Sequence, residues 1–206
     1  MKIAVFSDVH GNFEALNTVI GMIEKEQVDQ TIFIGDIFQR GNQEIECLEY
    51  LRNSDIICVK GNCELYIDKG VCIDPDVEYL QDYYDNMRKR LTAEQREFIH
   101  ELPLYYEKTV NGHKILFSHF LFHDIEADYP YYQLSDMVTD IFSKAVSSNE
   151  LRKYDLVVVG HAHRNFVDGN VVGVSAAGID KPTFILIEID EKVSYRYVSE
   201  ESMCKR

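Results

Sequence analysis

The amino-acid sequence predicts an α/β fold, and two patterns carry that prediction. Short apolar runs with the composition of β-strands recur along the chain, and stretches between them have the periodicity of helices. Nearly continuous apolar runs such as LVVVG, residues 156–160, are typical of strands buried on both faces of a sheet. The chain has 206 residues, which is enough for a substantial core, and we expect residues 1–206 to form a single domain.

Eight runs indicate strands, and antiparallel strands are expected in the last third of the chain. The run at 166–174 contains Asp168 and Gly169 between two strand-like halves, which is a hairpin signal. The run at 193–199 alternates polar and apolar residues, as in a strand with one exposed face. The eight runs are KIAVFS (2–7), TIFIG (31–35), DIICVKG (55–61), KILFSH (114–119), LVVVG (156–160), FVDGNVVGV (166–174), PTFILIEI (182–189) and VSYRYVS (193–199).

Two helices are indicated by apolar periodicity together with capping residues. The first lies between the first two strands, where apolar residues recur at i, i+3, i+4 and i+7 from Leu16 to Ile23, with a cap near Asn12. The second lies within LTAEQREFIHELP, residues 91–103, where Thr92 and Gln95 have the spacing of a capping box. The proline of this stretch marks the end of the helix.

Two further segments, residues 66–90 and 122–133, show only weak periodicity and are rich in Asp and Tyr. We interpret both as insertions over the scaffold, where loops often carry substrate contacts. Ordinary surface packing explains them equally well. His123, in the second segment, is close to His119 in sequence and could contact substrate.

Charge and cysteine content narrow the class of protein. With 21 basic and 35 acidic residues the formal net charge is −14, and no long basic run is present, so binding of long nucleic acid is not expected. The first residues lack the long apolar region and cleavage site of a signal peptide, and no run approaches a membrane-spanning length. Five cysteines without paired spacing are typical of reduced thiols. We therefore expect a cytoplasmic protein without membrane contacts.

Polar side chains follow five of the predicted strands at the point where each strand ends. Open α/β sheets place their ligands at the carboxyl ends of the strands. The regular recurrence of Asp, His and Asn at these ends indicates one functional site. The residues are Asp8 and His10 after the first strand, Asp36 after the second, Asn62 after the third, His119 at the end of the fourth, and His161 and His163 after the fifth.

The four His, two Asp and one Asn of this set are typical metal ligands. Such oxygen and nitrogen donors suit Mn, Fe, Ni or Zn, and the thiolates of a structural zinc site are missing. One ion takes about four protein ligands, so seven donors indicate two ions. The side chains of His161 and His163 would point the same way if the extended conformation continues through Gly160.

The motifs resemble those of the calcineurin-like metallophosphoesterases. The family pattern D-x-H, G-D, G-N-[HC]-[DE], H and G-H-x-H is present in this order from Asp8 to His163, about three quarters of the chain. The combination is specific, although D-x-H alone is weak. The small bacterial and archaeal phosphodiesterase branch is the most similar, because it too is compact and can have Cys in the third motif. The resemblance implies a four-layer αββα sandwich, in which two mixed β-sheets are flanked by helices.

The resemblance also implies a role for each ligand and a mechanism. A hydroxide between the two metals would attack phosphorus in line with the leaving oxygen. Two cations about 4 Å apart would lower the pKa of the bridging water and neutralise charge on the phosphate. The expected cofactors are two divalent transition-metal ions, Mn foremost, with Fe, Ni or Zn as alternatives. By the resemblance Asp8, His10 and His163 would hold one metal, Asn62, His119 and His161 the other, and Asp36 would bridge them.

Three residues near the motifs bear on the substrate. Arg40 fits the family spacing G-D-x-x-x-R-G, and it either contacts phosphate or braces its loop through an ion pair. Cys63 stands where the monoesterase branch has a His that supports leaving-group protonation, and a thiol is a poorer proton donor than an imidazolium. Phe120 stands where relatives commonly have Gly, which would narrow the substrate mouth. The candidate catalytic residues are Asp36, Arg40, Asn62 and Cys63.

The sequence thus favours a metal-dependent phosphodiesterase that acts on a small phosphorylated substrate, since a thiol at position 63 suits esters with less basic leaving groups. Two alternatives stay open. One is a phosphomonoesterase acting on a nucleotide or sugar phosphate. The other is a catalytically silent binding scaffold of the same fold, like the retromer subunit. All seven expected ligands are present, which favours an enzyme.

Overall fold

Two five-stranded mixed sheets form the centre of the computed structural model, which describes residues 1–70, 78–120, 151–179 and 181–203. The first sheet contains β1 (Lys2–Phe6), β2 (Gln30–Phe33), β3 (Ile57–Cys58), β9 (Thr183–Ile189) and β10 (Val193–Ser199). Its strand order is β10-β9-β1-β2-β3. Strands β1, β2 and β3 are parallel, whereas β9 is antiparallel to both β1 and β10.

The second sheet contains β4 (Tyr105–Val110), β5 (His113–Ser118), β6 (Leu156–Val159), β7 (Phe166–Asp168) and β8 (Val171–Gly173). Its order is β4-β5-β6-β8-β7, with β5, β6 and β8 parallel and an antiparallel strand at each edge. Strands β7 and β8 form the predicted hairpin, in which Gly169 adopts a φ of 59°. That left-handed turn is the reason for a glycine here.

The described helices include both helices that the sequence predicts. Asn12 Oδ1 accepts the N–H of Ala15 at 3.0 Å, and Thr92 and Gln95 form the expected capping box. No described helix is sufficiently long and apolar to cross a membrane. The helical segments are α1 (Phe13–Glu26), α2 (Glu44–Arg52), α3 (Asn62–Lys69), α4 (Glu78–Arg90), α5 (Ala93–Glu101), η2 (Leu151–Lys153) and α8 (Glu200–Met203).

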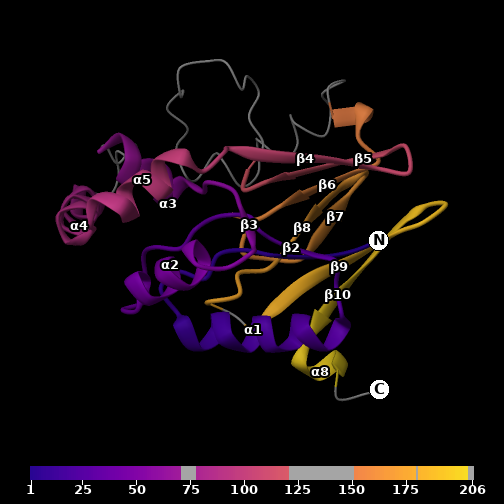
Figure 1. Ribbon diagram of the computed structural model, residues 1–206, viewed down its shortest axis with the longest axis horizontal. Helices are drawn as coiled ribbons and strands as arrows, with labels where there is room; N and C mark the ends of the chain where they lie inside the picture. The colour runs from indigo at the N-terminus through magenta and orange to yellow at the C-terminus, as the bar shows by residue number, and fades with distance from the viewer. Residues whose placement is uncertain (71–77, 121–150, 180, 204–206) are drawn as a thin grey trace.

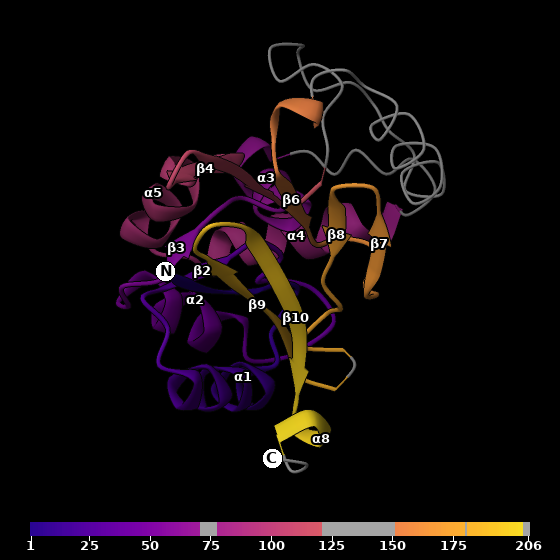
Figure 2. The ribbon, with the colours of Figure 1, turned by 90° about the vertical axis from the view of Figure 1, so that its right-hand side faces the viewer.

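The core lies in layers on and between the sheets. Figures 1 and 2 show α1 on one side of the first sheet and the second sheet on the other. Side chains such as Val5, Ile187 and Phe117 fill the space between the sheets. Leu16 of α1 and Leu48 of α2 pack with Phe33 on the outer face of the first sheet. On the outer face of the second sheet, Leu151 of η2 packs against side chains of β5, β6 and β8. The predicted αββα class is therefore confirmed.

Two expectations about individual elements were wrong. Within the segment 66–90 that the sequence analysis interpreted as a loop, residues 78–90 form a helix, α4, and its Leu80, Tyr84 and Met87 are buried in the core beside the first sheet. The predicted third strand is shorter than its apolar run, since only Ile57 and Cys58 pair with β2. Residues 122–133, including His123, lie outside the described residues.

The contact between the two sheets should dominate stability. Phe117 is completely buried in that contact, so Phe117→Ala should lower the free energy of unfolding by about 3–5 kcal/mol through lost burial and a residual cavity. Val167→Ala, at a side chain that is 56% exposed on an edge strand, should change it by less than about 0.5 kcal/mol. Urea unfolding of both variants measures the difference. Equal losses would contradict the assignment of the core.

Candidate metal centre

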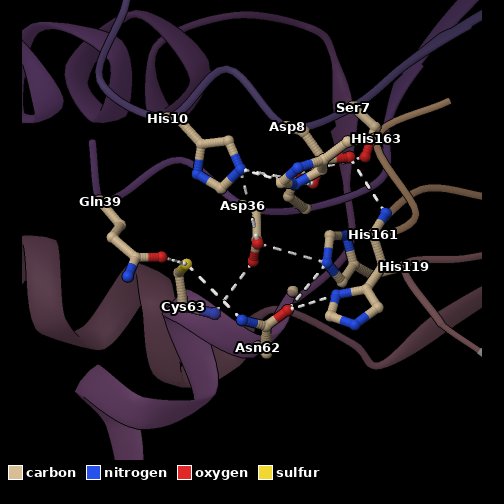
Figure 3. A network of polar contacts seen from close by, with 12 residues as sticks. Ser7, Asp8, His10, Asp36, Gln39, Asn62, Cys63, His119, His161 and His163 are labelled. Atoms are coloured by element: carbon tan, nitrogen blue, oxygen red, sulfur yellow. Dashed lines mark hydrogen bonds and ion pairs between the residues drawn. The ribbon is translucent and has the colours of Figure 1, made fainter. Parts of the chain in front are cut away.

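The seven predicted ligands converge at the carboxyl ends of five strands. They follow β1, β2, β3, β5 and β6, and Figure 3 shows their side chains gathered around a common centre. Asp8 and His119 are completely buried, whereas the side chain of His163 is 25% exposed. The set is therefore a buried polar cluster that opens to solvent on the side of His163. Its members are Asp8, His10, Asp36, Asn62, His119, His161 and His163.

The backbone is left-handed at most of these positions. Nine described residues other than glycine have positive φ, and five of them are predicted ligands. This conformation costs about 1–2 kcal/mol per residue, so neighbouring contacts must hold it. The N–H of Asp8 donates to the carbonyl of Gly35, and the N–H of His10 donates to that of Asp36. The five ligands are Asp8 (58°), His10 (45°), Asp36 (66°), His161 (60°) and His163 (52°).

The extended conformation does not continue beyond Gly160, so the condition under which His161 and His163 would share one face is not met. Strand β6 ends at Val159, and both following histidines lie in the left-handed region. Gly160 is required here because a Cβ would lie only 2.1 Å from Ser7 Oγ. His161 and His163 consequently turn to different partners instead of sharing one face.

Asp8, His10 and His163 form the first group of donor atoms. His163 Nε2 lies 3.1 Å from Asp8 Oδ1 and 3.0 Å from His10 Nε2. His10 Nε2 lies 3.6 Å from Asp8 Oδ1. Donors that share one ion at about 2.0–2.2 Å lie roughly 3 Å apart. The spacing therefore fits one metal ion.

Asn62, His119 and His161 form the second group, and Asp36 lies between the two. Asn62 Oδ1 is 3.1 Å from His119 Nε2 and 2.9 Å from His161 Nδ1. Asp36 Oδ2 is 3.4 Å from His119 Nε2 and 4.0 Å from His10 Nε2. Asp36 is thus the carboxylate within reach of both groups.

The polarity of these contacts fits a cation. His10 Nδ1 lies 2.8 Å from the carbonyl of Phe38, and His119 Nδ1 lies 2.8 Å from that of Ile34. A neutral ring donates its Nδ1–H to such a carbonyl, which leaves the Nε2 lone pair facing the cluster, as in metal-ligating histidines. His161 Nε2 is buried and has no hydrogen-bond partner in the described chain. Lone pairs that face oxygen atoms repel unless a metal ion or protons lie between them.

Charges within the cluster set its protonation. Burial opposes the charge on Asp36, but the neighbouring His119 lowers the pKa of this carboxyl to about 2. Burial disfavours a charged His119, but Asp36 and Asp8 raise its pKa to about 9. Burial and the charge of His119 lower the pKa of His161 to about 4. A metal ion must therefore displace a proton from His119, whereas His161 is already a neutral donor at pH 7.

Glu64, to which the sequence analysis gave no role, supports the cluster from behind. It is completely buried, and its carboxylate accepts backbone N–H groups from Asp36 at 2.9 Å, Ile37 at 2.7 Å and Gly61 at 2.7 Å. The bond to Gly61 is half of a capping box at the start of α3. The spacing of Glu64 three residues after Gly61 is the sequence signal that could have revealed it.

Cys63 lies inside the cluster as a protonated thiol. It is completely buried, and the hydroxyl of Tyr84 donates to its Sγ at 3.2 Å. Burial and the charge of Asp36 raise the pKa of the thiol well above its ordinary value. Its Sγ lies near donor atoms of His10 and Asp36, but a protonated thiol is a poor metal ligand. Its backbone N–H donates to Asp36 Oδ1 at 2.9 Å, which fixes that carboxylate.

The ring of Phe120 covers one side of the candidate metal centre. Phe120 is 3% exposed, and its ring packs against His119 and His161 with centroid distances of 5.6 and 5.7 Å. The ring therefore holds both imidazoles in place from one side. A glycine at this position would remove these two ring contacts from the histidines.

A pocket of about 380 Å³ opens beside His10, and Arg40 lines it together with Asn42, Gln43 and Ile179. The chain carries a net charge of −14, yet none of the described residues that line this pocket is acidic. Arg40 is exposed and forms no ion pair with a described carboxylate, so its charge is available to a bound anion.

Comparison with known proteins identifies the family. Residues 1–165 match the sequence model of the calcineurin-like phosphoesterases. The chain belongs to this family. An uncharacterized protein of Methanocaldococcus jannaschii is 32% identical to this phosphoesterase over 180 residues, which cover 82% of this chain and 67% of the relative.

Solved structures share the fold of this calcineurin-like phosphoesterase. A metallophosphoesterase from Sphaerobacter thermophilus superposes with a TM-score of 0.63 at 20% identity, covering 100% of this chain and 94% of that one. An archaeal phosphodiesterase superposes with a TM-score of 0.53 at 18% identity, covering 97% and 99%. The family uses divalent metals, and the donor groups described above are the possible ligands.

Replacing Glu64 should damage the centre without removing a donor atom. In Glu64→Gln the amide NH2 faces one of the three backbone N–H groups, so two buried donors meet and neither has an acceptor. The free energy of unfolding should therefore fall by more than about 2 kcal/mol. Metal affinity should fall as well, because Asp36 and Asn62 lose their shared anchor. Thermal unfolding and Mn²⁺ titration measure both effects. The exposed Glu97→Gln serves as control, and equal behaviour of the two variants would contradict this role.

Metal binding by this phosphoesterase should release protons. Below the His119 pKa of about 9 the ion displaces the proton of this ring, so apparent affinity should rise up to about tenfold per pH unit from about pH 6.5 to 8.5. In the metal-free protein the raised pKa contributes stability that is full below 6.5 and is lost as the pH rises toward 9. Calorimetric Mn²⁺ titrations in buffers of different ionisation enthalpy measure the release. A pH-independent affinity would contradict it.

Proposed function

We propose that this phosphoesterase is a dinuclear-metal phosphodiesterase that hydrolyses a small phosphodiester, with Mn²⁺ preferred and Fe, Ni or Zn as alternatives. The carrying observation is that two donor groups lie on either side of one carboxylate, Asp36. A site for two metals can hold both the attacking and the leaving oxygen of a displacement. Asp8, His10 and His163 would hold one ion, and Asn62, His119 and His161 the other.

The bound metals would supply Lewis acidity and a water of lowered pKa. The side chains would do the remaining work. Asp36 keeps Oδ2 between the donor groups because its Oδ1 is held by the N–H of Cys63. Arg40 would bind phosphate oxygens from the pocket beside His10, since a guanidinium matches phosphate geometry with two parallel N–H groups. Phe120 excludes water from the side of His119 that it covers.

Cys63 supports a diester rather than a monoester. Its thiol has a raised pKa and is engaged by Tyr84, so it gives little help to a leaving group that must be protonated. Esters with less basic leaving groups depend less on such help. A phosphomonoesterase acting on a nucleotide or sugar phosphate is the alternative outcome of the test below.

The complete donor set and the pocket lined by Arg40 support an enzyme over a silent scaffold. The net charge of −14 supports a small substrate over nucleic acid. Five cysteines without paired spacing support a cytoplasmic location.

Mn²⁺-loaded protein should bind two ions per chain and should hydrolyse bis(4-nitrophenyl) phosphate with a higher kcat/KM than 4-nitrophenyl phosphate. Asp36→Asn should lose at least about 100-fold in kcat, because a neutral amide binds cations poorly and does not offset their repulsion. The exposed Asp168→Asn is the matched control. Elemental analysis and steady-state kinetics provide the measurements. One ion per chain would exclude the dinuclear site, a preference for the monoester would establish the alternative, and full binding without turnover would establish the scaffold.

A further inference from the structure

Two adjacent tyrosines of α4 reach the two segments that carry the centre. The hydroxyl oxygen of Tyr83 accepts the backbone N–H of Gln39 at 2.7 Å, and the hydroxyl donates to Glu44 Oε1 at 3.0 Å. The hydroxyl of Tyr84 donates to Cys63 Sγ at 3.2 Å. Helix α4 thus touches the loop after Asp36 as well as the start of α3, although it contributes no metal donor.

The segment that Tyr83 contacts has an unfavourable backbone. Gln39 and Arg40 adopt φ angles of 73° and 76°, which residues with side chains rarely do. His10 anchors the chain on both sides of this turn, because its Nδ1 bonds to the carbonyl of Phe38 and its own carbonyl accepts the N–H of Gly41, each at 2.8 Å. Between these two anchors, Tyr83 holds the N–H of Gln39.

The hydroxyl of Tyr83 is itself oriented. Burial and the charge of Glu44 raise the pKa of Tyr83 above its ordinary value, so the hydroxyl keeps its proton. That proton points to Glu44, the first residue of α2, which is 3% exposed. A lone pair of the same oxygen therefore remains for the N–H of Gln39. The hydroxyl of Tyr83 therefore links α4 both to the start of α2 and to the loop that runs from Asp36 to α2.

We propose that Tyr83 is a positioning residue that fixes the left-handed turn at Gln39 and Arg40 and so places the Arg40 guanidinium at the pocket beside His10. The proposal rests on the proposed function in that Arg40 binds the substrate phosphate there. Without the hydroxyl, the N–H of Gln39 loses its acceptor and the turn relaxes. Substrate binding must then also order the Arg40 side chain, which lowers the affinity for substrate. The effect falls on substrate binding rather than on the metals, because the Tyr83 hydroxyl bonds to no predicted ligand.

Steady-state kinetics with bis(4-nitrophenyl) phosphate test the link to Arg40. Tyr83→Phe should raise KM about fivefold to tenfold and change kcat less than about twofold, with two metals still bound. Arg40→Ala should raise KM at least as much. Adding Tyr83→Phe to Arg40→Ala should change KM no further, because both variants remove the same contact. The proposal would be overturned if the KM increases of Tyr83→Phe and Arg40→Ala multiply in the double variant, or if Tyr83→Phe leaves KM unchanged.

Two further variants separate this role from general destabilisation. Tyr50→Phe removes a half-buried hydroxyl on α2 that has no hydrogen-bond partner among the described residues, and it should leave KM unchanged. Tyr83→Phe alone would leave the buried carboxylate of Glu44 without the hydroxyl that donates to it. The double variant Tyr83→Phe with Glu44→Gln also removes that carboxylate charge. It should recover thermal stability and keep the raised KM. Recovery of KM together with stability would show that Tyr83 acts only on the fold.

Amide hydrogen exchange tests the turn without any substrate. In Tyr83→Phe the peptide that covers residues 37–43 should exchange at least about tenfold faster, with other peptides and Tyr50→Phe unchanged. If the wild type hydrolyses no ester, the proposed function fails, and exchange alone decides whether Tyr83 fixes the turn. Unaltered exchange at residues 37–43 overturns the proposal in either case.

Discussion

The candidate metal centre depends on three hydrogen bonds that the Glu64 carboxylate accepts from the backbone. The two carboxylate oxygens accept N–H groups from the end of β2 and from the start of α3, so one side chain joins the segments that carry Asp36 and Asn62. These segments can approach because position 61 is glycine, where a Cβ would lie 2.3 Å from Asp36 Oδ1. Burial and the nearby charge of Asp36 raise the pKa of Glu64 to about 7, and the three N–H donors oppose that rise. The centre therefore depends on a carboxylate that binds backbone rather than metal.

Local strain at the ligands is offset by contacts that also select their chemistry. The left-handed backbone at Asp8, His10 and Asp36 turns three consecutive strand-end donors inward, at a conformational cost. The carbonyl of Phe38 compensates by bonding to His10 Nδ1, which directs the Nε2 lone pair into the cluster. One hydrogen bond thus holds the loop and fixes the tautomer that a metal needs. Stability and ligand geometry are coupled here.

The parts of the fold that the sequence predicted are those with local signals. Strand runs, the cap at Asn12 and the capping box at Thr92 each depend on residues a few positions apart, and the structure contains all of them. Helix α4 escaped prediction because its composition is strongly polar, although Leu80, Tyr84 and Met87 recur on one face and are buried. The need for a glycine at position 160 escaped because it depends on the close approach of Ser7, which lies 153 positions earlier. The bond of Glu64 to Gly61 has a local capping signal, but its bonds to Asp36 and Ile37 depend on the end of β2 meeting α3, which no local pattern encodes. Donor identity could therefore be predicted, whereas the contacts that orient the donors could not.

The donor set also explains how an acidic chain can attract an anionic substrate. The chain has a net charge of −14, but the seven predicted donors include only two carboxylates, Asp8 and Asp36, with four imidazoles and an amide. Two bound dications would outweigh these carboxylates and leave the centre positive, and the adjoining pocket adds Arg40 without an opposing described acid. Without metal the same carboxylates are balanced by protons on the histidines, as the raised pKa of His119 indicates. Attraction of phosphate to the centre would therefore depend on the metals being bound, because they would reverse the sign of its local charge while the net charge of the protein stays negative.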